Sequence, residues 1–247
     1  MRPIRAIDVV WFNYPTYVAA ALVVFASLLL LLTALLPDPV EVLVAIGAGM
    51  TAWWSVASVV AAAWVFDRPG YASLAWLPEA VEAHGSWLNV TAGFDATTST
   101  LRTVLGRTNG SALDLFDPSA RYDGPLLRAR RARPPMGAAA LPGGSLPVEG
   151  QSVDVVTMLM SAHELEDEEV RATALAEVAR VLQPAGRLVI AEFLRSPIIW
   201  LVFGPGAAHF RSRAEWLRIL AGAGFYVIGE RGLTPFVRAF VATAPTS

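Results

Sequence analysis

Two long runs without charge open the chain, and a different pattern follows them. No residue is charged from 9 to 37, and none from 42 to 66. A helix needs about 20 apolar residues to cross a bilayer core about 30 Å thick. The pattern therefore predicts a transmembrane helical hairpin within residues 1–66, with spans over 14–36 and 40–66. Two buried helices of a soluble fold are the alternative.

A short turn with two prolines separates the predicted spans. Pro37 and Pro39 lack the backbone N–H that a helix interior needs. The turn region carries the acidic residues Asp38 and Glu41. The outer flanks carry three arginines, Arg2, Arg5 and Arg68. Because basic residues favour the cytoplasmic side, we expect an integral protein of a bacterial inner membrane with both termini in the cytoplasm.

Small residues recur in the second predicted span. They are Ala45, Gly47, Ala48, Gly49, Ala52 and Ser55. Such residues let helix backbones approach closely. They indicate either packing of the hairpin on itself or a seam between two copies, which makes a homodimer a candidate assembly.

Beyond the hairpin, runs of strand length alternate with helical spacing. Strands are predicted over 87–90, 153–160, 187–191, 225–229 and 239–242, and helices over 97–105, 168–182 and 213–223. This alternation favours an α/β fold with a mostly parallel sheet and helices on both faces. The expected organisation is a linker at 67–83 and one domain at 84–247. Ligands of such sheets bind at the carboxyl ends of the strands.

The amino-acid composition excludes some partners and some kinds of catalytic chemistry. The net charge of −2 gives no general attraction for nucleic acid, so none is expected as a partner. The chain has no cysteine, which excludes thiolate ligands and nucleophiles, and no metal site is expected. Four arginines between 128 and 133 form a basic run that either lies against anionic headgroups or faces solvent.

Motifs in the second half of the chain resemble class I S-adenosylmethionine-dependent methyltransferases. They read VDVV at 153–156, AHEL at 162–165, EVARVLQPAGRL at 177–188 and LAGAGF at 220–225. The pattern is most similar to the ubiquinone/menaquinone C-methyltransferase-like group and covers about residues 84–245. The resemblance implies a Rossmann-like sheet of seven strands and S-adenosylmethionine as cofactor.

The same resemblance implies where the cofactor would bind. In the family an acid and a glycine-rich turn follow the first strand. Here Asn89 stands at the acid, Thr91 and Asp95 at two of the glycines, and Gly93 keeps its place. The Thr98 hydroxyl and the N–H groups of the next helix would face the methionine carboxylate.

The resemblance also implies that the ends of the next two strands would bind the adenosine half of the cofactor. Asp114 matches the acid that accepts both ribose hydroxyls, with Asp117 as the alternative. No acid occurs at 137–142, so adenine contact there, at Leu141 for example, would come from backbone or apolar packing.

His163 and Glu164 follow the fourth strand of the family pattern, where substrate meets the methyl group. His163 is a candidate general base with a pKa near operating pH, and Glu164 would share this task. Either residue could instead cap the helix that begins near Asp167. The apolar segment 193–210 is expected either to wall a substrate site facing the bilayer or to pack on the core.

Two functions fit these patterns. The first is a membrane-anchored methyltransferase for a hydrophobic small molecule or lipid-like substrate at the cytoplasmic face, with the bilayer as a partner. The second is a catalytically inactive, methyltransferase-like membrane scaffold or binding protein, because the glycine turn has lost two glycines.

Overall fold

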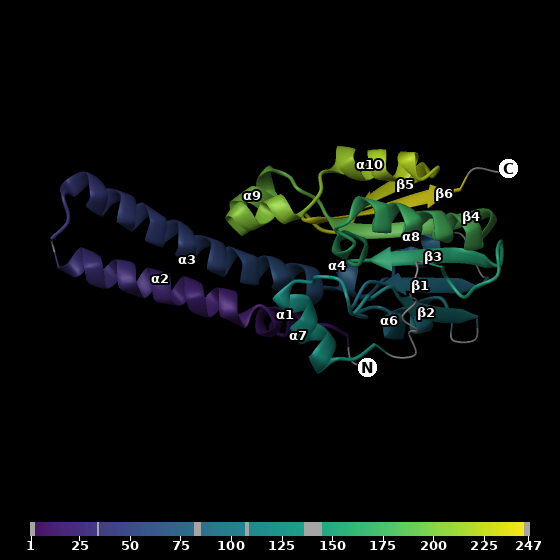
Figure 1. The fold of residues 1–247 in the computed structure, drawn as a ribbon, viewed down its shortest axis with the longest axis horizontal. Coiled ribbons are helices and arrows are strands. Elements are labelled where there is room, and N and C mark those ends of the chain that lie inside the picture. Colours follow the sequence, from purple (N-terminus) through teal and green to yellow (C-terminus); the bar gives the residue numbers. More distant parts are fainter. Residues whose placement is uncertain (1–2, 34, 82–84, 107–108, 136–144, 245–247) are drawn as a thin grey trace.

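In the computed structural model a helical hairpin projects from an α/β domain (Figure 1). The structure describes residues 3–33, 35–81, 85–106, 109–135 and 145–244. Three helices form the N-terminal part: α1 (Ala6–Phe12), α2 (Tyr14–Leu32) and α3 (Asp38–Phe66). Pro37 is the N-cap of α3, so the expected break between the two long helices is confirmed.

α2 and α3 lie side by side along most of their length (Figure 1). The hydroxyl groups of Tyr17 and Ser58 lie 3.2 Å apart and join the two helices. None of the residues of α2 is buried, although the helix is apolar throughout. Both helices are long and apolar enough to cross a membrane by length and composition.

The small residues of α3 differ in their surroundings. Ala48 is buried, whereas a Cβ added at Gly47 or Gly49 would meet nothing within 4 Å. The two glycines are therefore not used for close packing inside this chain. A seam between two copies stays a prediction.

The expected linker contributes to the domain core. It holds two short helices, α4 (Pro69–Ala72) and α5 (Leu77–Val81). Tyr71, Leu74 and Leu77 are each at most 2% exposed. This segment therefore seals one face of the sheet.

The described residues form one mostly parallel sheet with the order β2-β1-β3-β4-β6-β5. Its strands are β1 (Trp87–Thr91), β2 (Gly110–Asp114), β3 (Val153–Leu159), β4 (Leu182–Phe193), β5 (Tyr226–Gly232) and β6 (Val237–Thr243). The domain helices are α6 (Thr98–Val104), α7 (Gly124–Ala132), α8 (Glu168–Val181), α9 (Pro197–Phe203) and α10 (Arg213–Gly222). Two 3-10 turns, η1 (Ala162–Glu164) and η2 (Gly204–His209), complete it.

The prediction of seven strands is wrong, since this sheet has six. Among the described residues no strand lies between β2 and β3. Part of the reason is local: α7 follows β2, and Pro134 and Pro135, which follow α7, cannot donate to a strand ladder.

The segment QPAG at 183–186, whose proline and glycine are typical of a turn, is part of β4. Ala185 has φ of +65°, and the register against β3 shifts between Val153 and Val155. The turn is thus an irregularity within the strand.

Side chains that alternate along the strands pack into two apolar layers, one on each face of the sheet. Val156, Met158 and Ile190 pack with α8 and α10 on one face. On the other face Val155 and Val189 pack with α4, α5, α9 and the end of α3. This second layer joins the hairpin to the sheet.

The contact between α3 and α9 depends on a glycine. The indole Nε1 of Trp53 donates to the Leu201 carbonyl at 2.9 Å. Gly204 ends α9 with φ of +53° and ψ of −134°, where L side chains are strained. A Cβ there would lie 2.4 Å from the Trp54 ring. Only glycine lets the chain turn at this distance from α3.

Replacing this glycine tests the contact. We expect Gly204→Ala to lower the free energy of unfolding by about 2 kcal/mol or more, through backbone strain and overlap with Trp54. Gly206→Ala is the matched control, since its Cβ would meet only Phe203 at 4.0 Å. Unfolding of both purified variants in detergent measures the difference. Equal stability of the two variants contradicts this account of the junction.

Candidate functional site

The first part of the site is the turn after β1. Gly93 has φ of +99°, and a Cβ there would lie 3.0 Å from Leu126 and 3.1 Å from Phe116. The retained glycine is therefore needed for both conformation and space. The neighbours that approach it are side chains of this chain, and one of them, Leu126, lies on α7.

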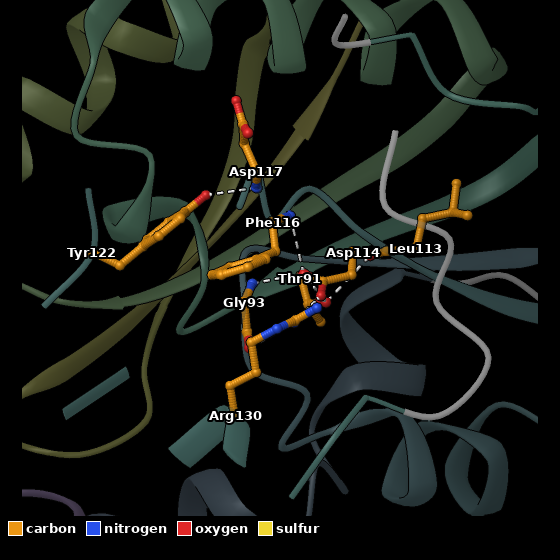
Figure 2. Close-up of polar contacts among 8 residues, drawn as sticks. All are labelled: Thr91, Gly93, Leu113, Asp114, Phe116, Asp117, Tyr122 and Arg130. Atoms are coloured by element: carbon orange, nitrogen blue, oxygen red, sulfur yellow. Dashed lines mark hydrogen bonds and ion pairs between the residues drawn. The ribbon is translucent and has the colours of Figure 1, made fainter. Parts of the chain in front are cut away.

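Asp114 ends β2 beside this turn and is 1% exposed. Its Oδ1 accepts from the backbone N–H of Gly93 at 2.6 Å and of Phe116 at 3.3 Å. Its Oδ2 pairs with the guanidinium of Arg130 from α7 (Figure 2). The carboxylate thus stands where the resemblance places the ribose acceptor, with Arg130 on the outward oxygen.

Arg130 makes further contacts that hold it over the turn. Its Nη1 donates to the Gly93 carbonyl at 3.0 Å. Its guanidinium carbon lies 3.9 Å from the centroid of the Phe116 ring, which stacks on Tyr122 (Figure 2). Thr91, a predicted cofactor residue, is buried and donates from its hydroxyl to the Leu113 carbonyl at 3.3 Å.

Asp117, the alternative to Asp114, lies outside this cluster. Its Oδ1 accepts from the Ser119 backbone N–H at 2.8 Å and hydroxyl at 2.7 Å. These bonds lower the pKa of its carboxyl. Asp117 caps its own turn, so the geometry favours Asp114 as the strand-end acceptor.

Asn89 and Thr98 face each other inside the domain. The Asn89 amide donates to the Thr98 hydroxyl at 2.8 Å, and its carbonyl oxygen accepts from Thr157 at 2.9 Å. Asn89 and Thr98 are at most 2% exposed. These two predicted cofactor residues thus bind one another and link β1, β3 and α6.

The N-terminus of α6 is capped by the chain itself. Asp95 Oδ1 accepts from the backbone N–H of Thr97 at 3.1 Å and of Thr98 at 2.9 Å. Two of the N–H donors that the sequence offered to a ligand carboxylate, those of Thr97 and Thr98, are therefore paired with Asp95. Leu141 lies outside the described residues.

The second part of the site follows β3. His163 lies in η1, and its Nδ1 is 2.7 Å from Glu192 Oε2. The other oxygen of Glu192 accepts from the backbone N–H groups of Ala162 and His163, at 2.8 and 3.2 Å. His163 Nε2 lies 3.3 Å from Glu164 Oε1. An imidazole thus sits between two carboxylates.

Glu192 was missed by sequence reasoning. It belongs to β4 and is 1% exposed. The available signal was a carboxylate at the end of the apolar run LVIAEF, since a buried charge needs a partner. Its partner, His163, is 29 residues earlier in the chain.

A cavity of about 600 Å³ connects this second part to the hairpin. Leu159, His163 and Phe193 line it at the carboxyl ends of β3 and β4, and Phe94 lines it after β1. Residues of α2, α3, α7 and η2 complete its wall. The predicted location of a ligand site at the carboxyl ends of the strands therefore coincides with a real cavity. Five residues of the segment 193–210 line it: Phe193, Phe203, Gly206, His209 and Phe210.

The pKa of His163 is displaced upward. Burial alone would lower it, but the charge of Glu192 and the hydrogen bonds that the imidazole donates to Glu192 and Glu164 outweigh burial and raise the pKa to about 10. The imidazole is then protonated at neutral pH. The expected pKa near operating pH is wrong for this arrangement, and the side chain rests as a hydrogen-bond donor between carboxylate acceptors.

Comparison with known proteins supplies the family. Residues 92–190, from the end of β1 into β4, match the family described as "Methyltransferase domain". The chain carries a class I S-adenosylmethionine-dependent methyltransferase domain. No curated protein matches the chain.

Several solved structures are similar to this chain in fold. The PH0226 protein from Pyrococcus horikoshii OT3 is 13% identical, with a TM-score of 0.51 over 70% of this chain and 88% of that chain. The pyocyanin biosynthetic protein PhzM is 19% identical, with a TM-score of 0.51 over 70% and 54%. A putative type 11 methyltransferase from Sulfolobus solfataricus is 18% identical, with a TM-score of 0.49 over 70% and 91%.

The cofactor of the methyltransferase domain is S-adenosylmethionine, and Asp114 fits its ribose. Two backbone N–H groups hold the carboxylate in place. Arg130 reaches its outward oxygen from a helix outside the sheet, so a ligand hydroxyl can replace the guanidinium without unfolding the strand. The residues thus fit the cofactor once Arg130 has withdrawn.

This competition predicts an unusual effect of removing a basic residue. We expect Arg130→Gln to bind S-adenosylhomocysteine about tenfold more tightly, because the ligand no longer breaks a charge-assisted bond. Arg131→Gln removes the same charge from an exposed position of α7 and serves as control. Calorimetry in detergent measures both affinities. Equal or weaker binding by Arg130→Gln shows that Arg130 does not compete.

The His163 pair predicts how stability depends on pH. A group whose pKa is raised on folding stabilises fully below its unfolded pKa, here 6.5, and loses this contribution as pH rises toward about 10. We expect the difference in unfolding free energy between wild type and His163→Gln to shrink by more than about 1 kcal/mol from pH 6 to pH 9. Denaturant titrations measure it, with His209→Gln as control. A difference that does not change with pH contradicts the raised pKa.

Proposed function

We propose that this protein is a membrane-anchored methyltransferase that acts on a hydrophobic small molecule or lipid-like substrate at the cytoplasmic membrane face. The observation that carries the proposal is the shared cavity, which reaches from His163 to the two long apolar helices. A substrate dissolved in a bilayer would meet such a cavity directly. Quinone precursors, isoprenoids and polyketides have the required apolar character.

The surface of the hairpin supports a bilayer location. Large apolar side chains such as Leu22, Phe25 and Leu43 are at least 60% exposed. In water such a contiguous surface would be costly, whereas in lipid it is favourable. The acidic turn at Asp38 and the arginines of the flanks favour the orientation with the catalytic domain in the cytoplasm.

α9 extends this apolar surface at the base of the domain. It lies beside α3 (Figure 1), and its exposed side chains include Ile198, Trp200 and Leu201. A short helix with one face buried in the domain and one apolar face exposed is suited to the membrane interface. We propose that α9 rests on the same leaflet that the hairpin enters.

The proposed chemistry needs little from the protein beyond orientation. When bound, S-adenosylmethionine supplies an electrophilic methyl group. The cavity wall excludes water and aligns the acceptor atom. Glu164 is more exposed than Glu192, 21% against 1%, and can accept a proton from the acceptor. His163, held by Glu192 at Nδ1, can donate a hydrogen bond from Nε2 to the acceptor when the acceptor replaces Glu164 there.

A catalytically inactive membrane scaffold or binding protein is the second candidate. The observation that favours it is the pairing of Asp114 with Arg130, together with the capping of α6 by Asp95. In that case Arg130 would permanently fill the ribose site. The two functions differ in whether the cofactor can displace it.

Binding of S-adenosylhomocysteine to the full chain in lipid nanodiscs separates the two. We expect binding by wild type and, in the Arg130→Gln background, a loss of tenfold or more on Asp114→Asn, because ribose acceptance is charge-assisted. The Arg130→Gln background removes the effect of breaking the ion pair itself. Absence of binding by both folded wild type and folded Arg130→Gln contradicts the methyltransferase function and favours the inactive relative.

A further inference from the structure

α7 lies beside α1 at the base of the hairpin, where the two long helices meet the α/β domain (Figure 1). Its two faces carry different side chains. Leu126 is buried in the domain, and Arg130 reaches Asp114 from the same side of the helix. Arg128 and Arg131, three positions apart, share the opposite face, on which Arg131 is exposed and Arg128 is half-buried. α7 therefore directs one cation toward the strand ends and two away from them.

Aromatic and basic side chains surround this base of the hairpin. The rings of Trp11 and Tyr14 stack at the start of α2, with centroids 5.6 Å apart. The guanidinium of Arg128 lies 5.7 Å from the Tyr14 ring, and that of Arg68 lies 4.1 Å from the Trp64 ring near the end of α3. Aromatic rings of this kind gather at the level of lipid head groups.

The length of α2 supports the same level. Its 19 residues extend over about 28 Å at 1.5 Å per residue, which matches the hydrocarbon core of a bilayer. If α2 spans that core, the aromatic rings at its start lie at the head groups. The outward face of α7, which contacts these rings, then faces the same layer.

In the present arrangement a phosphate at this level would meet few unengaged cations. Arg128 Nε donates to the Phe12 carbonyl at 2.6 Å. Arg130 is paired with Asp114 (Figure 2). Arg131 is the exposed member of the three. If α7 moved outward, the guanidinium groups of all three arginines would become available to phosphates.

This difference links lipid binding to the ribose site. A ligand shifts an equilibrium only by binding one arrangement better than the other. Anionic surfaces attract nearby basic side chains, and a phosphate accepts charge-assisted hydrogen bonds from guanidinium groups. Anionic head groups therefore favour the outward arrangement, which also removes Arg130 from Asp114. Two ligands that favour the same arrangement raise each other's affinity.

We propose that the outward face of α7 binds the phosphates of anionic phospholipids, and that this binding releases Arg130 from Asp114 and opens the ribose site to the cofactor. In a neutral bilayer the ion pair keeps the site closed. The inference rests on the proposed function for the location in a bilayer and for the identity of the cofactor.

The first test measures cofactor affinity against lipid charge. Calorimetry follows binding of S-adenosylhomocysteine to the full chain in nanodiscs of phosphatidylcholine alone and in nanodiscs with one third phosphatidylglycerol. The ligand has no net charge at neutral pH, so a charged surface does not concentrate it. We expect binding about tenfold tighter in the anionic nanodiscs. Inorganic phosphate added to the neutral nanodiscs should give no such gain.

Three variants locate the effect on α7. Arg130→Gln removes the ion pair itself, and we expect it to bind S-adenosylhomocysteine tightly and equally in both lipids. Arg131→Gln should match wild type in phosphatidylcholine and lose about threefold of the gain in anionic nanodiscs. Arg218→Gln is the matched control and should keep the full gain. It removes the same charge from an exposed position of α10, on the face of the sheet away from α3.

A distance measurement follows α7 without any cofactor. Because the chain has no cysteine, Thr103→Cys on α6 and Ala132→Cys on α7 place two spin labels at exposed positions. Double electron–electron resonance reports the distance between them in each lipid. We expect a second distance that grows in population with the fraction of phosphatidylglycerol.

The results separate this inference from the function itself. Equal affinity in the two lipids, an equal gain from inorganic phosphate, or the same gain in Arg130→Gln as in wild type each overturn it. In all three cases S-adenosylhomocysteine still binds, and the methyltransferase function stands. If no lipid and no variant gives binding, the proposed function fails. The spin labels then decide the lipid site alone: a second distance in anionic lipid supports it, and one unchanged distance overturns it.

Discussion

Burial of the C-terminal end of α3 against the sheet is the constraint on which the architecture depends. Ala61 and Val65 are at most 1% exposed and belong to the same apolar cluster as Val155 and Val189 of the central strands. Because the hairpin is packed into the domain core, its inner face becomes part of the domain's ligand cavity. A flexible tether would keep the catalytic domain near a membrane, but it would not line the site.

Two buried carboxylates at the strand ends are stabilised in the same way. Asp114 and Glu192 are each 1% exposed. Each accepts hydrogen bonds from two backbone N–H groups and pairs with one cationic side chain. Their cations differ in origin. His163 is held in η1 directly after β3, whereas Arg130 comes from α7, which is attached to α1.

Contacts between α7 and α1 connect the proposed cofactor site to the base of the hairpin. Arg128 Nε donates to the Phe12 carbonyl at 2.6 Å, and Arg133 pairs with Asp8 at 3.0 Å. The basic run of the sequence is therefore used largely inside the protein. Withdrawal of Arg130 from Asp114 would have to occur on a helix that also contacts the base of the hairpin.

The sequence predicts the elements of this fold better than its site. The charge-free runs and the 3.6-residue periodicity indicate α2, α3, α8 and α10, because local spacing decides which face a helix buries. Asp114 and His163 became candidates because the resemblance places one at the end of a strand and the other just after a strand. Glu192 and Arg130 were missed, since their contacts are with partners distant in the chain. No local pattern indicates that Arg130 lies on Asp114.

One cavity joins the hairpin to the catalytic domain, and cysteine labelling tests this connection directly. Because the chain has no cysteine, a single Ser58→Cys label reports on the cavity wall, and Val60→Cys, which replaces a residue that is 56% exposed, reports on the outer surface of α3. The measurement is the rate at which N-ethylmaleimide modifies each cysteine in nanodiscs, with and without 4-decylphenol as an apolar occupant of the cavity. We expect severalfold protection of the cysteine at position 58 and none at position 60. Equal rates at position 58 with and without 4-decylphenol would contradict the connection.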